Sequence, residues 1–369
     1  MDDGDTLEYR VARYFFHKGF ITRQSLPLKT YFYPEIFDIT DIDVYTIKFD
    51  NDFSDKVIIA DCKSGTSPKS KESKPLNRLF WLRGLMTFLN VNQGYFIKPR
   101  ISEKIKKFSS NLNIVPLDYE WLNETELRLN LSNDNRGSYA IQNADQLHTF
   151  YQKIRAHPDH IEFFYWFLRL KFWTIPSNIQ IKEIMRGHSI LVKKCSFKND
   201  YEIWLLGESA ILLAIALLKF CSELYPLSEK ERERRIELKM IEGIGSIEQQ
   251  NKILDLMRIF AQEKVFETCK KRIQISEKEL TITSPPYTPQ LMELISRILE
   301  QPEISIQTPR FLDFFIYEYI INEKEVNAAE LHQLFPQNLD LIAKQSKNII
   351  KFLDPDIKNN EKFSKLINF

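Results

Sequence analysis

The sequence predicts an α/β domain, built as a mixed sheet flanked by helices, followed by a larger, mainly α-helical domain with small β-hairpins. Three observations predict this architecture. Strand and helix patterns alternate through the first 125 residues, helical patterns dominate the later residues, and 43% of the 369 residues are hydrophobic. A chain of this length and composition can bury two cores, so we expect domains at residues 1–125 and 126–369.

The first domain is expected to have the element order αβββαβαβ. A helix is predicted at residues 5–18, because Leu7, Val11 and Phe15 recur at helical spacing and Gly19 follows as a stop signal. The other elements are predicted from apolar runs between turn signals. They are strands at residues 20–26, 43–49 and 57–63, a helix at 78–89, a strand opening at 94–97, a helix at 102–112 and a strand at 113–117.

The second domain is expected to consist mainly of helices. Helical patterns cover residues 160–172, 208–224, 228–242, 246–271, 288–300, 309–322 and segments beyond 328. Hairpins are predicted at residues 189–206 and 272–283, each around a short polar turn. The most apolar segment, residues 209–218, is too short to span a bilayer and is interpreted as a buried helix.

Charge and cysteine content limit the function classes. The net charge is only +1, yet residues 61–107 hold eleven Lys and Arg against three acidic residues, which favours a local nucleic-acid contact. The four cysteines form no CxxC pair, which argues against zinc ribbons and a disulfide framework. No export signal or membrane span is visible, so we expect a cytoplasmic protein without a membrane partner.

The segment KVIIADCKSG, residues 56–65, ends an apolar strand pattern with Asp61 and Lys63. Side chains alternate along a strand, so this carboxylate and this ammonium share one face. If the hairpin turns symmetrically about Asp52, Asp43 lies opposite Asp61 and Asp41 lies opposite Lys63. Two carboxylates held this close repel each other unless a cation lies between them.

Paired carboxylates with a backbone carbonyl suit a hard divalent cation such as Mg²⁺ or Mn²⁺. Such a cation activates a bound water and neutralises charge on a phosphodiester during in-line attack. Lys63 could orient or deprotonate that water, or stabilise the transition state. The pattern therefore predicts metal-dependent phosphodiester hydrolysis.

These residues resemble the PD-(D/E)XK nuclease superfamily, which has the restriction-endonuclease-like fold. Glu8 on the opening helix, Asp43 at the start of a strand and Asp61-Cys62-Lys63 at the end of the next strand are similar to the motif of this family. The order of elements after the motif is similar too. The resemblance covers residues 1–125 and implies a nuclease, with DNA favoured as substrate, while the residues themselves leave RNA open.

The resemblance implies a role for each matching residue. Asp43 and Asp61 would bind the metal together with the Cys62 carbonyl, Lys63 would be the catalytic lysine, and Glu8 would reach the metal or its water. No proline precedes Asp43, so Asp41 remains a rival ligand.

The helix after the motif lacks the glutamine that many relatives carry and offers basic residues instead. The basic side chains expected to contact phosphates are Lys69, Lys71, Lys74, Arg78 and Arg83.

Other interpretations of these residues remain open. Asp5 and Glu8 could form a helix cap, and Asp61 with Lys63 could be a surface ion pair worth about 0 to 1 kcal/mol. The chain could retain the fold as an inactive binding or scaffold protein, or its helical domain could sense a ligand that switches the nuclease on. A restriction or antiviral defence role, with a homodimer or a partner protein of such a system, fits the architecture.

Overall fold

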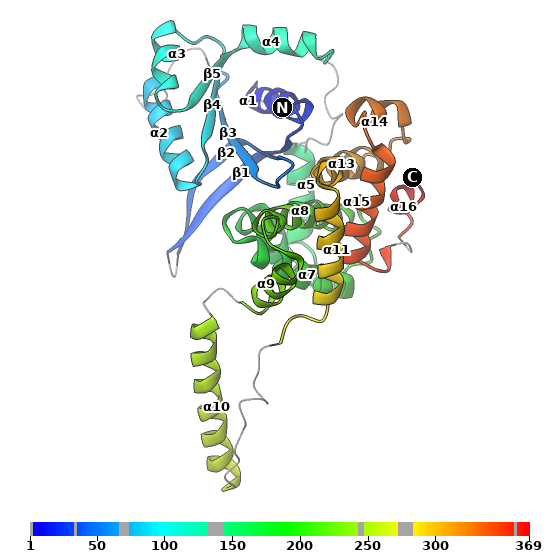
Figure 1. Ribbon diagram of the computed structural model, residues 1–369. Coiled ribbons are helices and arrows are strands. Elements are labelled where there is room, and N and C mark those ends of the chain that lie inside the picture. Colours follow the sequence, from blue (N-terminus) through cyan, green and yellow to red (C-terminus); the bar gives the residue numbers. More distant parts are fainter. Residues whose placement is uncertain are drawn as a thin grey trace.

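A computed structural model describes residues 3–32, 35–65, 74–131, 144–242, 247–271, 283–357 and 360–369 (Figure 1). Its N-terminal part is a five-stranded sheet with helices on both faces, as the sequence predicts. The elements are α1 (Asp3–His17), β1 (Ile21–Phe32), β2 (Glu35–Phe49), β3 (Asp55–Cys62), α2 (Pro75–Phe88), β4 (Gln93–Lys98), α3 (Glu103–Ser110), β5 (Ile114–Asp118) and α4 (Tyr119–Arg128).

The sheet has the strand order β1-β2-β3-β4-β5 and is mixed. Strands β1, β2 and β3 form an antiparallel meander, whereas β3, β4 and β5 run parallel. Val44 pairs with Ala60 and Phe49 pairs with Asp55, which is the register of a hairpin that turns symmetrically about Asp52. The predicted register is therefore confirmed. It places Asp43 of β2 beside the end of β3.

The two faces of the sheet have separate partners because side chains alternate along each strand. Val44, Ile58 and Ala60 pack with residues of α1 in one core cluster, whereas Ile59 and Phe96 belong to a larger cluster with residues of α2. Helix α4 joins the α1 face, since Glu126 accepts hydrogen bonds from both Arg10 and Arg13. The expected boundary at residue 125 thus falls inside α4, and we assign this helix to the sheet domain.

The rest of the described chain is mainly helical, as predicted. Its elements are α5 (Ala144–Arg155), α6 (Glu162–Arg169), the 3₁₀ helix η1 (Lys171–Thr174), α7 (Ser177–Lys194), α8 (Asp200–Leu224), α9 (Glu229–Ile241), α10 (Ile247–Cys269), α11 (Thr288–Glu300), α12 (Pro302–Ser305), α13 (Thr308–Phe315), the π-helix η3 (Ile316–Ile321), α14 (Ala328–Leu334), α15 (Leu339–Leu353) and α16 (Ser364–Asn368).

The hairpin predicted at residues 189–206 is wrong, because this stretch is the end of α7 and the start of α8. Its apolar residues contact helices rather than a strand partner: Leu191 and Ile203 both lie in the large core cluster. The polar turn around Asn199 is the connection between two helices. Most of the hairpin predicted at residues 272–283 lies outside the described residues.

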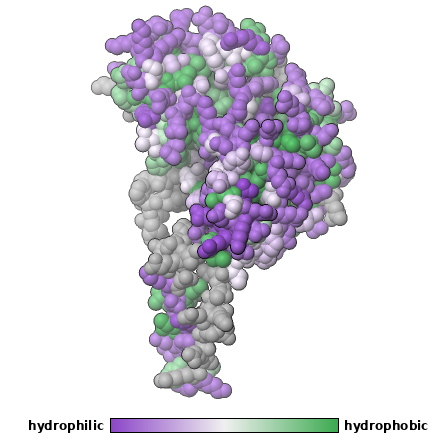
Figure 2. Space-filling model, in the orientation of Figure 1, coloured by the Kyte–Doolittle hydropathy of each residue, from purple (hydrophilic) through white to green (hydrophobic). Residues whose placement is uncertain are grey.

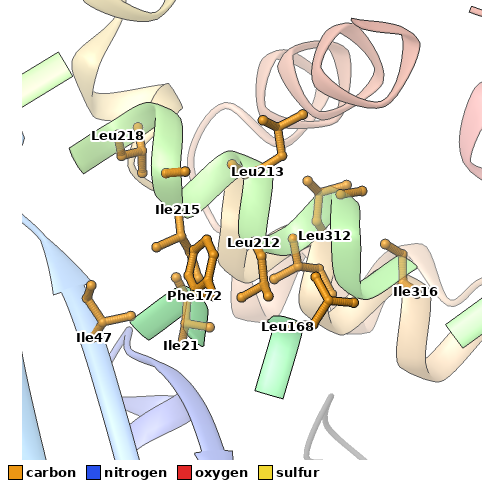
Figure 3. Packing of buried hydrophobic residues seen from close by; sticks show 14 of the residues in the cluster. Ile21, Ile47, Leu168, Phe172, Leu212, Leu213, Ile215, Leu218, Leu312 and Ile316 are labelled. Atoms are coloured by element: carbon orange, nitrogen blue, oxygen red, sulfur yellow. The ribbon is translucent and has the colours of Figure 1, made fainter. Parts of the chain in front are cut away.

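Helix α8 is the centre of the helical domain. Length and composition alone would let it cross a membrane, and it is the one such helix in the described ranges, but 94% of its most apolar window is buried inside the protein. Figure 3 shows Ile21 and Ile47 of the sheet close to Phe172 and Ile215, so the apolar core continues from the sheet into α8. The segment predicted to be a buried helix, residues 209–218, forms the middle of this helix.

A buried polar contact also joins the two parts of the chain. Arg23 of β1 donates two hydrogen bonds to Glu208 of α8, at 2.9 and 3.1 Å, and its third nitrogen lies 3.0 Å from Asp313 of α13. Tyr317 donates to Glu208 and accepts a hydrogen bond from Trp204. These contacts hold the helical domain against β1. Ser25, two residues after Arg23, lies close to the candidate active site.

Candidate active site

Asp61 and Lys63 lie together at the end of β3. Asp61 is 2% exposed and Lys63 follows the last strand residue, where its backbone N–H donates to the Ile97 carbonyl at 2.9 Å. This bond continues the pairing with β4 and holds the Lys63 side chain on the Asp61 face. The Lys63 ammonium lies 3.0 Å from Asp61 Oδ1.

Asp43 completes the group from the neighbouring strand. Its Oδ2 accepts a hydrogen bond from the Cys62 backbone N–H at 2.7 Å and another from Lys63 Nζ at 3.0 Å. Lys63 therefore bridges two carboxylates that come from β2 and β3. The structure thus brings Asp43, Asp61 and Lys63 together, whereas the rival Asp41 is exposed.

A second cation occupies Asp61. Arg78 of α2 donates from Nε to Asp61 Oδ2 at 3.0 Å and from Nη2 to Oδ1, so the guanidinium contacts both carboxylate oxygens. The same guanidinium lies 3.9 Å from the centre of the Trp81 ring, which is a close cation–π contact. Helix α2 thereby covers the acid pair, and Arg78 holds Asp61 in a fixed orientation.

Burial and neighbouring charges change the pKa values of this group. Burial raises the pKa of the Asp43 carboxyl, and the Asp61 carboxylate raises it further, against the lowering effect of Lys63. Burial alone would lower the pKa of Lys63, but Asp61 and Asp43 outweigh burial and raise it. Lys63 is therefore a firmly protonated ammonium in this arrangement, which suits charge stabilisation better than proton abstraction.

The donor set fits a hard divalent cation. Two carboxylates share the site, and the pKa of Asp43 is raised mainly by burial and further by the charge of Asp61, both of which a bound cation would offset. A crevice lined by Asp43, Asp61 and Trp81 lies beneath them, but it is too narrow to admit a water molecule. The groups at this site that could hold such a cation are the Asp43 and Asp61 carboxylates and the Cys62 carbonyl, and Asp61 is paired with Arg78 here.

Glu8 lies on the other side of this strand end. Its carboxylate accepts a hydrogen bond from Ser25 Oγ at 3.0 Å. Burial is the main cause of the raised pKa of the Cys62 thiol, and the charges of Asp43, Glu8 and Asp61 raise it further. Glu8 is thus near enough to Cys62 for its charge to act on the thiol, and its described contact is with Ser25 rather than with Asp43, Asp61 or Lys63.

Ser25 was not predicted from the sequence. It interrupts β1 at the position opposite Asp43, between the pairs Gln24–Val44 and Leu26–Ile42, and its φ of 44° is rare for a residue other than glycine. The buried Arg169 of α6 donates to the Ser25 carbonyl at 2.9 Å. The helical domain therefore holds Ser25 in this conformation, and Ser25 in turn contacts Glu8.

The expected phosphate contacts are only partly described. Lys69 and Lys71 lie outside the described residues, Lys74 is exposed just before α2, and Arg83 is half-buried on the same helix. Arg78 contacts Asp61 instead of pointing freely to solvent. Lys98 is 6% exposed and is the last residue of β4. It follows Ile97, which pairs with Cys62, so Lys98 and Lys63 are neighbours across the two strands.

A second group of possible metal ligands lies in the helical domain. One ligand atom each of His157, Cys195 and Glu202 falls within 4.8 Å of the others. Two of its members have hydrogen-bond partners within the protein: Glu202 accepts from the Ser196 hydroxyl, and His157 Nδ1 accepts from the Asp159 backbone N–H. His157 Nε2 lies 3.8 Å from Glu202 Oε1.

No family model, no curated protein and no solved structure matches this chain. Its function is therefore inferred from the geometry of its own residues.

Proposed function

We propose that the chain is a metal-dependent nuclease of the PD-(D/E)XK type, and that Asp43, Asp61 and Lys63 form its active site. The observation that carries the proposal is the 3.0 Å approach of one lysine ammonium to two largely buried carboxylates at the end of a central strand. The order of elements from α1 to β4 supports it, because it agrees with the order that the sequence resemblance implies. In this proposal, the sheet domain has a restriction-endonuclease-like fold.

Each residue has a distinct task in this proposal. A divalent cation held by Asp43, Asp61 and the Cys62 carbonyl would supply an activated water and a counter-charge for the phosphate. Lys63, as an ammonium, stabilises the negative charge that develops on the phosphorus oxygens. Glu8, which accepts a hydrogen bond from Ser25, would orient a water in this proposal.

Arg78 controls access to Asp61 in this proposal. Its guanidinium is bidentate on the acid and would be equally suited to a phosphate group. An arriving phosphodiester therefore competes for Arg78, and the exchange releases Asp61 for the cation. The surplus of basic residues between 61 and 107 supports a nucleic-acid substrate, with DNA favoured by the resemblance.

The proposal is tested by cleavage assays with Mg²⁺ or Mn²⁺ on single-stranded, double-stranded and branched DNA and on RNA. We expect cleavage by the wild type and a loss of at least about 100-fold in Asp61→Asn and Asp43→Asn. Asp50→Asn, which alters an exposed acid directly after β2, is the matched control and is expected to retain activity. Equal activity in all four proteins would place the active site elsewhere.

The Arg78–Asp61 pair also supports a second candidate, an inactive scaffold that retains the fold. In that case two cations and two carboxylates would form a permanently neutral cluster with a structural role. Absence of both cleavage and Mn²⁺ binding, with nucleic-acid binding intact, would favour this candidate. A restriction or antiviral defence role remains a proposal from the combination of a small sheet domain with a larger helical one.

A nuclease gated by a ligand is a further form of the proposal. A cavity of about 570 Å³ lies among α7, α11 and α15, which is a volume that can hold a small molecule. Tyr287 and Phe352 supply aromatic walls, Lys351 supplies positive charge, and Arg297 is paired with Glu293, which also lines the cavity. Activation of cleavage by a small anionic molecule that no longer acts on Lys351→Ala would support gating.

A further inference from the structure

Arg169 of α6 connects the helical domain to the strand that carries Ser25. Its Nη2 donates to the Ser25 carbonyl at 2.9 Å and to the Gln24 carbonyl at 3.3 Å. Figure 2 shows hydrophilic residues over much of the visible face of both domains. Arg169 lies beneath the molecular surface, since it is 5% exposed. A buried guanidinium that donates to two successive carbonyls leaves that piece of backbone little freedom to move.

The helical domain holds Arg169 from its own side. Tyr165 lies four residues earlier on α6, on the same face of this helix. Burial raises the pKa of Tyr165, and the charge of Arg169 and a hydrogen bond with it act in the opposite direction. The Tyr165 ring lies 5.6 Å from the ring of Trp204 of α8. Arg169 is therefore anchored beside the aromatic core of the helical domain.

Ser25 reverses the alternation of side chains along β1. In an unbroken strand, odd-numbered and even-numbered residues point to opposite faces. Before Ser25, the odd-numbered Ile21 lies in the large core cluster and Arg23 contacts α8. After Ser25, the even-numbered Leu26 and Leu28 lie in the same cluster. The change of face occurs at Ser25, whose φ of 44° is left-handed.

The reversal turns the Ser25 hydroxyl toward α1. In an unbroken strand, Ser25 would share the face of Arg23. Instead, Ser25 Oγ donates to Glu8 Oε2 at 3.0 Å, and α1 packs on the opposite face together with Val44. Ser25 also lies opposite Asp43 in the register of β1 and β2. The helical domain, Glu8 and the strand of Asp43 therefore meet at Ser25.

The backbone of Ser25 has a conformation that favours glycine. A residue with a side chain keeps such a φ only where surrounding contacts enforce it. Glycine would relieve the strain, but it has no hydroxyl to donate to Glu8. The serine therefore indicates a role for the hydroxyl, and Arg169 supplies a contact that holds the strained backbone.

We propose that Ser25 and Arg169 are positioning residues, through which the helical domain orients Glu8 at the proposed active site. Arg169 holds the backbone of Ser25, and the Ser25 hydroxyl holds the Glu8 carboxylate. The inference rests on the proposed function, since it takes the water-orienting task of Glu8 from there. It adds that the packing of α6 against β1 controls the activity of the sheet domain.

Steady-state cleavage kinetics of the full-length protein test the role of Ser25. We expect Ser25→Ala to lower kcat by about 10- to 100-fold and to leave KM for the nucleic acid unchanged. The same substitution made in Glu8→Gln is expected to add little further loss, because the hydroxyl acts through Glu8. Ser346→Ala removes a buried hydroxyl of α15 and is the control that retains activity. Additive losses of Ser25→Ala and Glu8→Gln would overturn the coupling.

Ser25→Gly separates the hydroxyl from the stability of the fold. Glycine accepts the left-handed backbone, so this variant is expected to melt no lower than Ser25→Ala. Its kcat is nevertheless expected to fall as far as that of Ser25→Ala. Wild-type activity in Ser25→Gly would show that the hydroxyl has no role and would overturn the proposal.

Substitution of Arg169 tests the contribution of the helical domain. We expect Arg169→Ala to lower kcat to the level of Ser25→Ala, and Arg169→Lys, which keeps a charged donor, to restore part of it. Arg232→Ala is the matched control, because Arg232 also donates to two successive carbonyls, those of Leu224 and Tyr225, but lies in α9. Equal activity in Arg169→Ala and Arg232→Ala would contradict the positioning role.

Crystal structures of the same variants separate this inference from the proposed function. In Arg169→Ala we expect Ser25 to leave the left-handed region and its hydrogen bond to Glu8 to be lost, whereas Arg232→Ala keeps both. A wild type that cleaves no substrate would overturn the proposed function, and the structures would still decide whether Arg169 holds Ser25. An unchanged Ser25–Glu8 contact in Arg169→Ala would overturn the inference, whatever the activity of the wild type.

Discussion

The ammonium of Lys63 lies 3.0 Å from Asp61 Oδ1 and 3.0 Å from Asp43 Oδ2. This amine thus bridges two largely buried carboxylates that come from adjacent antiparallel strands, and Arg78 also contacts Asp61. Ionisation of both Asp43 and Asp61 would be unfavourable without a cation, because two carboxylates held close together repel each other. The predictions that concern the site follow from this contact.

Replacement of Lys63 is expected to abolish cleavage. Lys63→Met removes the charge that stabilises the transition state, and we expect a loss of at least about 100-fold in kcat. Lys63→Arg keeps the charge but changes its shape, and is expected to retain partial activity. Lys56→Met alters an exposed lysine of the same strand and serves as the control. Single-turnover cleavage rates decide between these outcomes, and full activity of Lys63→Met would contradict the proposed role.

The effect of a divalent cation on stability is expected to depend on pH. The pKa of Asp43 is raised in the folded protein, so the stability linked to this group is present at low pH and is lost as pH rises through the folded pKa. Mg²⁺ offsets that loss because it binds the ionised carboxylate. We expect Mg²⁺ to raise the melting temperature near neutral pH and to lose this effect in acid.

Asp43→Asn is the control for this pH dependence, because it removes the titrating group. Calorimetric melting with and without Mg²⁺ across the acidic to neutral range measures the effect. If the rise in melting temperature caused by Mg²⁺ became larger as pH falls, this would contradict binding at the ionised Asp43 carboxylate.

Release of Asp61 from Arg78 is expected to strengthen cation binding. Arg78→Gln removes the bidentate guanidinium and its charge, so Asp61 loses one of its two cationic partners and keeps Lys63 at Oδ1. We expect Mn²⁺ to bind several-fold more tightly by titration calorimetry, while affinity for nucleic acid decreases. Arg83→Gln changes a half-buried arginine of the same helix and controls for the loss of charge. Weaker Mn²⁺ binding in Arg78→Gln would indicate that Arg78 supports the metal site instead of competing with the ion.

The buried pair between Arg23 and Glu208 is expected to hold the two parts of the chain together. Both side chains are 1% exposed, so Glu208→Gln removes one of the two carboxylates that contact Arg23 and leaves Asp313. We expect the free energy of unfolding to fall by about 3 kcal/mol. Arg297→Ala breaks an exposed ion pair with Glu293 and is expected to cost less than about 1 kcal/mol. Equal effects of the two substitutions in urea unfolding would contradict this role.

Much of the sheet domain could be predicted from the sequence because its signals are local. The apolar runs of β2 and β3 predict two strands, and a hairpin that turns symmetrically about Asp52 gives the register that places Asp43 beside Asp61. The hairpin predicted at residues 189–206 failed for a different reason. Residues 202–206, at the start of α8, are buried on all sides, and such burial removes the periodicity that separates helix from strand.

Two features of the site depend on contacts that are distant in the sequence. Arg78 was expected to contact phosphate, but its partner Asp61 lies 17 residues earlier and is reached only through the packing of α2 on the sheet. Ser25 is held by Arg169, which lies 144 residues later. Strand propensity alone predicts an ordinary extended residue at Ser25. Its unusual backbone conformation depends on the contact with the helical domain, which local sequence does not indicate.

The position of a bound cation is the most direct test of the proposed site. Crystals of the full-length protein grown with Mn²⁺ and a nucleic-acid oligomer would be examined by anomalous diffraction. We expect one ion at about 2.0 to 2.3 Å from carboxylate oxygens of both Asp43 and Asp61, with Arg78 moved from Asp61 to a phosphate. An ion bound elsewhere, with Asp61 still paired to Arg78 and the oligomer in place, would contradict the proposal.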